Sequence, residues 1–430
     1  MLAIRLAAMR RSLIGRLQEN DVSLAELAGF GSHSINQVSS SLVKNTTVTS
    51  FKFNSCDLDD EDCAILMKAL ISRYEYQSNN LCITCRPRTK RILLARNNIG
   101  IAGAQQIARF LCFPSIEYDR KKNNHASPTF CRGISTCDCC GAKRDISLRL
   151  KEDFIRLELF SNKVGDEGVT AIANAIASTD RRINDRSHCI VELGFERNEI
   201  SNVGMISISK MLTTNKSLHT LHLGRNVITH DGIIHLSNAL KRNSTLEVLN
   251  LTGNVLIGDK GAAILSESLN INTTLQTLLL KKCGIGDRGA NCLIRALYHA
   301  QSPYDLVRNS NHTLRDISLC SRYLCKDFVL NNVTLRILLS CNGVGGSATA
   351  QRLKLGFYLY SDHGIRYVHS LGLDRKLFPA LLCKLRRIHR DDYMLKLPTN
   401  NLGVLWNYLR GMPEILEEAH FRDRNQHVME

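Results

Sequence analysis

The sequence lacks the segments that would place it in a membrane or on a secretory route. No apolar run among its 430 residues approaches the ~20 residues needed to span a bilayer. It also lacks a secretory h-region, so its 16 cysteines are expected to be reduced thiols and not a disulfide framework. These absences predict an intracellular, cytoplasmic protein.

The first eighteen residues leave an alternative location open. They contain four arginines and no acidic residue, a composition typical of a mitochondrial presequence. An amphipathic helix that caps the start of the fold explains the same residues, and we favour it.

Familiar catalytic motifs are also missing. The sequence contains no G-x-x-x-x-G-K-[ST] phosphate loop, no H-E-x-x-H metal motif and no G-x-S-x-G nucleophile elbow. It therefore predicts a protein that is not an enzyme, that has no small-molecule substrate and that requires no cofactor.

The charge is strongly unbalanced. Fifty-six Lys and Arg residues against 40 Asp and Glu residues give a formal net charge of +16, which favours an acidic partner through long-range attraction. The basic residues are spread along the chain, the longest cluster being Arg120–Lys122, and no pattern of base-stacking aromatics accompanies them. We therefore expect a protein partner. RNA binding through net charge stays open as an alternative, and a steep loss of binding with salt would be its signature.

A repeat dominates the middle of the chain. Four similar segments start 28, 28 and 29 residues apart, within the range of ~20 to 29 residues typical of leucine-rich repeats, at Ile190, Leu218, Leu246 and Leu275. Each opens with apolar residues at alternating positions, such as Leu221 and Leu223, which predicts a short strand with one buried side. After a glycine, an apolar pattern recurs at helical spacing. Every unit is therefore expected to be a strand followed by a helix.

A small polar residue ends each predicted strand. The residues at this position are Asn162, Asn198, Asn226, Asn254 and Cys283, with Cys56 and Cys341 at weaker matches. Because the chain turns there, we expect these side chains to be buried and to satisfy backbone groups of adjacent coils.

These residues resemble the ribonuclease-inhibitor-like leucine-rich repeats that also occur in NOD-like receptors and Ran GTPase-activating proteins. The shared pattern is LxxLxLxxN/CxI, a turn with glycine and an amphipathic helix. It covers residues 154 to about 300 cleanly and extends less perfectly to 50–70 and 91–111. The resemblance implies an α/β solenoid, a curved horseshoe with parallel strands inside and helices outside.

The predicted organisation has three parts. We expect an N-terminal cap with a degenerate repeat at 1–47, a solenoid at 48–345 with insertions at about 72–88 and 113–148, and a helical C-terminal cap or small domain at 346–430. A cap is expected because an open solenoid end would expose its core.

The two insertions contain paired cysteines. Cys82 and Cys85 form one C-x-x-C pair, and Cys137 and Cys140 form another. Both insertions leave equivalent points of neighbouring coils, so the four thiolates are candidates for a structural zinc site. Ordinary thiols in loops are the alternative.

Six of the seven N-x-S/T triplets in the sequence start at Asn45, Asn215, Asn243, Asn272, Asn311 and Asn332. In a secreted protein they would be glycan acceptors. Here they recur with the repeat, mostly where a helix ends. We interpret them as structural, with Asn in a left-handed cap conformation and Thr starting the next turn.

The outward strand positions form the expected binding surface on the concave face of the solenoid. The candidates are Arg156, Glu158, Phe160, Glu192, Glu196, Arg197, His222, Arg225, Asn250, Lys281 and Lys282. Mixed charge with one aromatic suits a protein partner better than a nucleic acid, since phosphates favour a uniformly basic groove. The sequence predicts a protein-interaction scaffold.

The resemblance to Ran GTPase-activating proteins raises one alternative, a regulator of a small GTPase. Those proteins carry an acidic C-terminal tail, whereas this sequence ends in HFRDRNQHVME and is basic overall. It also lacks the nucleotide-binding module of NOD-like receptors. The resemblance therefore rests on the repeat alone, and a shared fold does not fix function.

Overall fold

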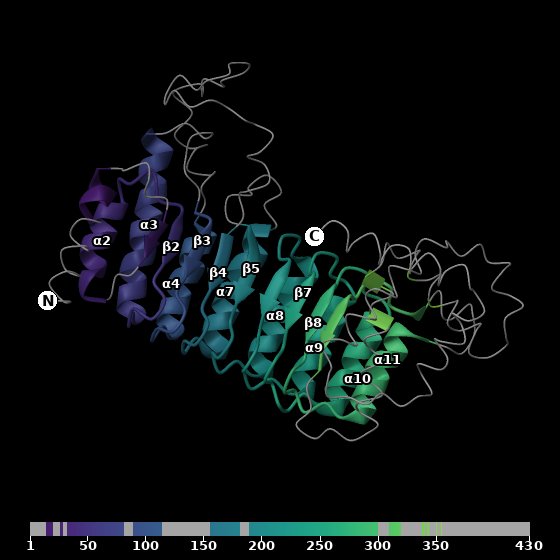
Figure 1. Cartoon of the computed structure of the whole chain (residues 1–430). Coiled ribbons are helices and arrows are strands. Elements are labelled where there is room, and N and C mark those ends of the chain that lie inside the picture. The colour runs from purple at the N-terminus through teal and green to yellow at the C-terminus, as the bar shows by residue number, and fades with distance from the viewer. Residues whose placement is uncertain are drawn as a thin grey trace, which may run out of the picture. The chain divides into compact units, whose positions relative to one another are not determined.

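The computed structural model describes residues 14–19, 26–28, 32–80, 89–113, 155–180, 189–299 and 309–319, and six further residues between 338 and 354. The chain divides into two compact units, residues 1–228 (unit 1) and 229–430 (unit 2). In the described residues of each unit, short strands alternate with helices, as Figure 1 shows. This is the predicted strand and helix alternation.

The described part of unit 1 contains six strands. They are β1 (Glu26–Ala28), β2 (Ser50–Lys52), β3 (Arg91–Leu93), β4 (Ile155–Glu158), β5 (Ile190–Gly194) and β6 (Thr220–His222). Each strand pairs in parallel with the next one along the chain. The register aligns one buried apolar residue per coil, namely Phe51, Ile92, Leu157, Leu193 and Leu221.

The helices of unit 1 follow these strands. They are the 3-10 helix η1 (Ser32–Ser34) with α2 (Ile35–Leu42), then α3 (Asp60–Asn80), α4 (Ile101–Cys112), α7 (Gly165–Asp180) and α8 (Asn202–Thr214). Helix α2 confirms that the sequence before residue 48 contains the helical half of a further coil. Helix α3 departs from expectation, because it continues through residues 72–80, which the spacing assigned to an inserted loop.

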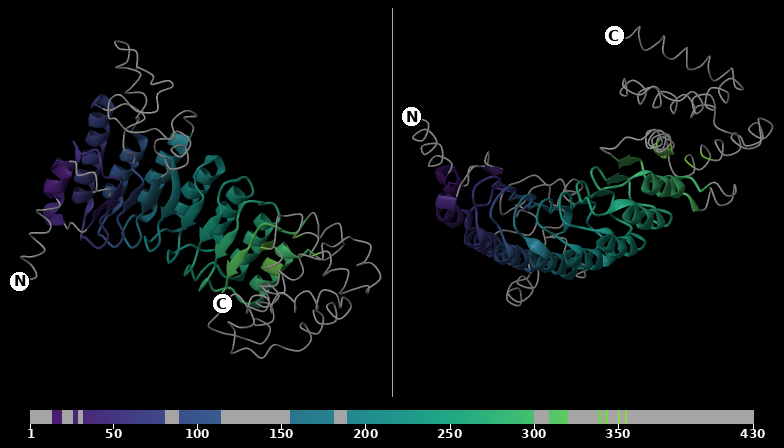
Figure 2. Two further views of the ribbon diagram at one scale, coloured as in Figure 1. Left: turned by 45° about the horizontal axis from the view of Figure 1, so that its top comes forward. Right: turned by 90° about the horizontal axis from the view of Figure 1, so that it is seen from below.

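Unit 2 repeats the pattern with helices α9 (His230–Leu240), α10 (Gly258–Leu269) and α11 (Asp287–Leu297). Its described strands are β7 (Val248–Asn250), β8 (Thr277–Leu279) and β9 (Asp316–Ser318). They pair in parallel, with Leu249 opposite Leu278 and Leu278 opposite Ile317. Figure 2 shows that the helices of each unit form one layer and the strands another.

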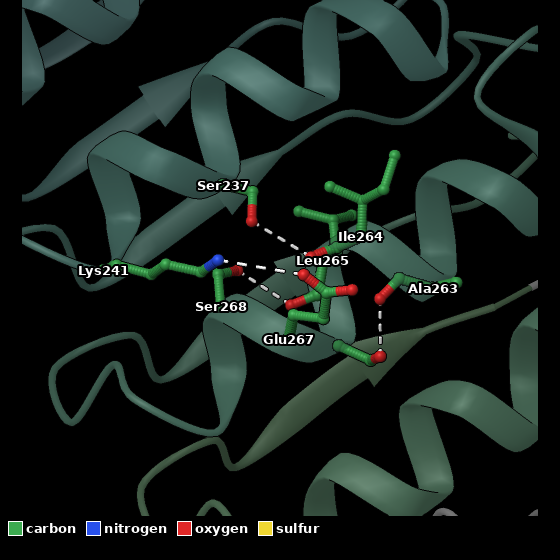
Figure 3. A network of polar contacts seen from close by, with 8 residues as sticks. Ser237, Lys241, Ala263, Ile264, Leu265, Glu267 and Ser268 are labelled. Carbon is green, nitrogen blue, oxygen red and sulfur yellow. Dashed lines mark hydrogen bonds and ion pairs between the residues drawn. The ribbon is translucent and has the colours of Figure 1, made fainter.

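The core lies between these two layers. In α9 the residues at helical spacing, Ile233, Leu236 and Leu240, are all buried against the strand leucines, as the sequence pattern predicts. Each such side chain contributes roughly 1.5–3 kcal/mol when fully buried. Neighbouring helices also meet through polar contacts, because the Ser237 hydroxyl donates to the Ile264 carbonyl at 3.0 Å (Figure 3).

The asparagine that follows each of β3, β4, β5 and β6 is buried and bridges two coils. Asn162 donates from Nδ2 to the carbonyl oxygens of Leu94, one coil earlier, and Leu159, at 2.9 and 3.0 Å. Its Oδ1 accepts the backbone N–H of Ile99 at 3.1 Å. Asn198 and Asn226 make the same kinds of bond. These residues, together with Asn97, are called the ladder asparagines of unit 1, and they confirm the expected role of the turn position.

Unit 2 places Cys283 at the equivalent position. Its side chain is buried, and its Sγ donates to the Leu251 carbonyl at 3.2 Å. Cys56 is at the turn position of β2 and is half-buried; its backbone N–H donates to Asn97 Oδ1 at 3.0 Å. Cys341 lies outside the described residues.

The N-x-S/T asparagines form a second set of bridges. Asn272 Oδ1 accepts the backbone N–H groups of Thr274 and Leu275, while its Nδ2 donates to the carbonyl of Leu240 at 2.8 Å. Asn45, Asn215, Asn243 and Asn311 are buried as well. A structural role is therefore correct for these five, whereas Asn332 lies outside the described residues.

The expected left-handed conformation of these asparagines is wrong. None of the five has a positive φ, and Asn215 has φ −68°. In Asn272, the side-chain oxygen instead accepts backbone N–H groups of the turn that follows it. Its side-chain N–H groups donate to a carbonyl of the preceding coil. Asparagine thus suits this position because its side chain both accepts and donates hydrogen bonds, and not because it tolerates a left-handed backbone.

Aspartates cap the helices of neighbouring coils. Asp166 in α7 accepts at Oδ1 the backbone N–H groups of Ser201 and Gly204, at 2.8 and 2.9 Å, at the start of α8. Asp60 and Asp259 do the same for α4 and α11. A Cβ on Gly204 would lie 2.6 Å from Asp166 Oδ1. The recurrent glycine therefore lies inside the first helical turn, where the cap leaves no room for a side chain, and not before the helix.

Removal of one ladder asparagine tests this arrangement. We expect Asn198→Ala to lower the unfolding free energy by about 2–3 kcal/mol, because buried backbone groups lose their partners. The measurement is the urea midpoint of the full chain. The matched control is Asn98→Ala, an exposed amide that bonds only Asp57, which should change stability by less than about 0.5 kcal/mol. Equal effects of the two variants would contradict the structural role of the ladder.

Candidate functional site

The outward side chains of β4, β5 and β6 meet on one surface of unit 1. The register places Arg156 beside Glu192, and Arg156 Nε lies 3.4 Å from Glu192 Oε2. His222 Nε2 lies 3.7 Å from Glu192 Oε1. Because the Arg156 side chain is 53% exposed, its ion pair contributes only about 0–1 kcal/mol and is free to exchange for contacts with another molecule.

Glu158 is a half-buried acid of this surface. Half-burial is the main cause that raises its pKa, and the nearby carboxylates of Glu192 and Glu196 raise it further, whereas His222 acts in the opposite direction. Its side chain covers Gly194, where an added Cβ would lie 3.3 Å from Glu158 Cγ. Three carboxylates thus crowd one half-buried patch.

Phe160 extends the patch beyond the end of β4. The guanidinium carbons of Arg96 and Arg197 lie 5.7 and 6.0 Å from the centroid of its ring, within cation–π range. Phe160 stays half-buried, so part of the ring still faces solvent. The structure therefore brings the unit 1 candidates together in one surface, which we call the strand face: Arg156, Glu158, Phe160, Glu192, Glu196, Arg197, His222 and Arg225.

Arg96 was not predicted from the sequence. It directly precedes the ladder residue Asn97, as Arg197 precedes Asn198 and Arg225 precedes Asn226. This shared position, one residue before the asparagine, is the sequence feature from which Arg96 could have been predicted.

The residues before the ladder asparagines have a left-handed backbone. Arg96, Ser161, Arg197 and Arg225 have φ values from 53° to 56°. This geometry directs each N–H toward the next coil: Arg96 donates to the Phe160 carbonyl at 2.7 Å and Arg197 to the Gly224 carbonyl at 2.9 Å. In unit 2 the position holds Gly253, which prefers such φ values, in one coil and Lys282, with φ 57°, in the next. Arginine is uncommon there and costs of order 1 kcal/mol in backbone strain.

A groove of about 410 Å³ runs along the ladder asparagines of unit 1. Its floor contains Asn97, Asn162 and Asn226. The lining also includes residues that precede ladder positions, Ser161, Arg197 and Arg225, and residues that follow them, Asn98, Lys163, Glu199 and Val227. We call it the turn groove. Lys163 and Glu199 are further candidate site residues that the sequence did not single out.

The unit 2 candidates differ in accessibility. Lys281 and Lys282 are exposed. Asn250 is only 9% exposed, and its Oδ1 accepts the backbone N–H of Thr252 at 3.0 Å, so it presents little surface to a partner.

Candidate metal ligands lie beyond what the structure describes. Cys82, Cys85, Cys137 and Cys140 are all outside the described residues, so the zinc site stays a prediction. Within the described ranges no group of three or more His, Cys, Asp or Glu side chains is arranged to hold a metal ion. Burial raises the pKa of the Cys283 thiol to about 11, which keeps it protonated and suits a packing role. Of the C-terminal region from 346, only residues 350 and 354 are described.

The comparison with known families agrees with the repeat geometry. A model described as leucine-rich repeat matches residues 154–173, 214–237, 242–266 and 272–293. The chain carries leucine-rich repeats of the ribonuclease-inhibitor type. It is similar to ribonuclease inhibitor from Sus scrofa, with 25% identity over 170 residues, which is 39% of this chain and 31% of that protein. The repeat protein thus spans under a third of the length of this relative.

A second finding concerns membranes. In the part of this leucine-rich-repeat protein that the structure describes, no helix combines the length and the apolar character needed to cross a bilayer.

The raised pKa of Glu158 gives a pH-dependent prediction. Because its pKa in the folded state lies above that of the unfolded chain, ionisation of Glu158 costs stability as pH rises. We expect Glu158→Gln to raise the melting temperature at pH 7 to 8. The gain should shrink as pH falls toward the ordinary carboxyl value near ~4.3, where Glu158 is protonated in both states.

The measurement is thermal unfolding of the full chain between pH 4 and 8. Glu199→Gln serves as the control, since Glu199 is exposed in the turn groove. A Glu158→Gln effect that is negative at neutral pH, or that does not vary with pH, would contradict the carboxylate crowding.

Proposed function

We propose that this leucine-rich-repeat protein is a non-catalytic scaffold that captures a protein partner on the strand face of unit 1. The observation that carries the proposal is Phe160, whose half-exposed ring lies against two guanidinium groups. An aromatic ring flanked by arginines is typical of the residues that contribute most to binding in protein interfaces.

The charges of the strand face support a specific protein partner. The Arg156 side chain is 53% exposed, so a partner can replace its ion pair with Glu192 at little cost. His222, whose side chain is half-buried, lies 3.7 Å from the same carboxylate. Glu158 and Glu196 add acid beside the arginines, so the face is mixed in sign. Such a pattern disfavours a phosphate backbone and favours a surface with complementary charges of both signs.

The similarity to ribonuclease inhibitor adds support of a general kind. That relative is named for inhibiting an enzyme, which is itself a protein. Since the match covers 31% of its length, we extend to this chain only the use of the repeat for protein binding.

We also propose a cytoplasmic location for the scaffold. Cys63 and Cys283 are buried thiols that form no disulfide, as a reducing compartment favours. Fractionation of cells that express the full chain tests this point.

Affinity capture with matched variants tests the proposed function. We expect Phe160→Ala combined with His222→Ala to reduce recovery of the partner at least tenfold, measured by quantitative mass spectrometry after nuclease treatment. The control variant is Val203→Ala with Ile206→Ala, which alters side chains that are 62% and 49% exposed on helix α8. It should leave recovery unchanged.

Two outcomes would count against the proposal. Partner recovery that survives the Phe160 and His222 changes but falls with the α8 changes would move the site to the helical side. Recovery that disappears on nuclease treatment would favour the RNA alternative.

A further inference from the structure

The turn groove of unit 1 is positively charged. Of its lining side chains, Lys163, Arg197 and Arg225 are cationic and Glu199 is anionic, which gives 3 − 1 = +2. All four are exposed. Among the described residues none of the three cations has a carboxylate within ion-pair distance, so their charges are not neutralised there.

The asparagine side chains of the turn groove already form hydrogen bonds within the protein. Asn226 donates both amide hydrogens to the carbonyls of Phe195 and Leu223, each at 2.9 Å, and its Oδ1 accepts two backbone N–H groups. Asn162 donates both amide hydrogens to the carbonyls of Leu94 and Leu159, and its Oδ1 accepts the backbone N–H of Ile99. We therefore assign recognition to the charged side chains of the lining.

The two arginines are placed as a pair. Arg197 and Arg225 occupy the same offset in neighbouring coils, and neighbouring parallel strands lie ~4.8 Å apart. Each guanidinium group can hold a carboxylate through two parallel N–H···O bonds. Both residues have a left-handed backbone, at which glycine would be free of strain. The strain is therefore offset by what the arginine side chains do at this site.

We propose that the turn groove binds an acidic segment, rich in Asp and Glu, of the protein partner. This inference rests on the proposed function and names the chemistry that the partner brings. In an extended segment alternate side chains lie on the same side, ~6.6 Å apart, so that two such carboxylates can each pair with one of the two arginines. The chain's net charge of +16 attracts such a segment from a distance.

The groove fits single-stranded RNA less well. Its lining contains no aromatic side chain on which a base would stack. Glu199 also interrupts the positive surface that a continuous phosphate backbone needs.

Fluorescence polarisation of a labelled peptide tests the inference on the full chain. The probe is an eight-residue peptide of alternating Glu and Ser at 150 mM salt, with a Lys and Ser peptide and an eight-nucleotide oligouridylate as comparisons. We expect the acidic peptide to bind at least tenfold more tightly than either. Arg197→Glu with Arg225→Glu should weaken its binding at least tenfold.

The control carries the same change of charge away from the groove. Arg109→Glu with Lys210→Glu alters exposed residues of helices α4 and α8 and should change the affinity by less than twofold. A third variant, Arg197→Gly with Arg225→Gly, removes both charges at positions where glycine suits the backbone. It should fold at least as stably as the unaltered chain and still lose the peptide.

Equal weakening by the groove and control variants would overturn the inference, as would oligouridylate binding that matches or exceeds that of the acidic peptide. Failure of the acidic peptide to bind, with partner capture still dependent on Phe160, would overturn the groove assignment alone. Loss of both would overturn the proposed function as well.

Discussion

The need to satisfy buried backbone groups at each turn controls this structure. Strands of three to five residues form too few ladder bonds to hold coils together alone, and the chain leaves each strand through a turn whose carbonyls face the core. In the coils that carry an asparagine at this position, one buried amide meets that need, as Asn162 does by bonding both its own coil and the one before it. A buried unpaired group costs about 1–3 kcal/mol, so a shift of one coil that broke these bonds would be unfavourable. The asparagine therefore fixes the distance between the two coils that it bridges.

The same constraint produces the candidate site. To reach the core, Asn198 needs the residue before it in a left-handed conformation, and that residue's N–H then bonds the next coil. The side chains on either side of the asparagine are left facing solvent, coil after coil. In unit 1 these positions hold Arg197, Arg225 and Lys163, and the repeat thereby aligns basic groups into a groove beside the mixed charges of the strand face.

Much of this could be predicted from the sequence. The alternation of apolar residues gave the strands, the 28-residue spacing gave the coil, and the outward strand residues from Arg156 to His222 do lie together. Interactions between coils were harder to predict from the sequence. Asp166 caps a helix 35 residues later, a pairing that periodicity does not reveal. Asn250 was counted as outward because strand alternation ignores the turn that its side chain closes. Helix α3 runs past its expected end because the spacing records extra residues and not their conformation.

Hydrogen exchange on the full chain, alone and with the captured partner, tests the account most directly. The partner should slow exchange of backbone amides in residues 155–163, 190–199 and 218–227, which include the strand face and the turn groove. Exchange in helices α7 and α8, on the opposite layer, should stay unchanged. Protection confined to those helices, with none in the strands and turns, would contradict the proposal that this repeat binds through its strand side.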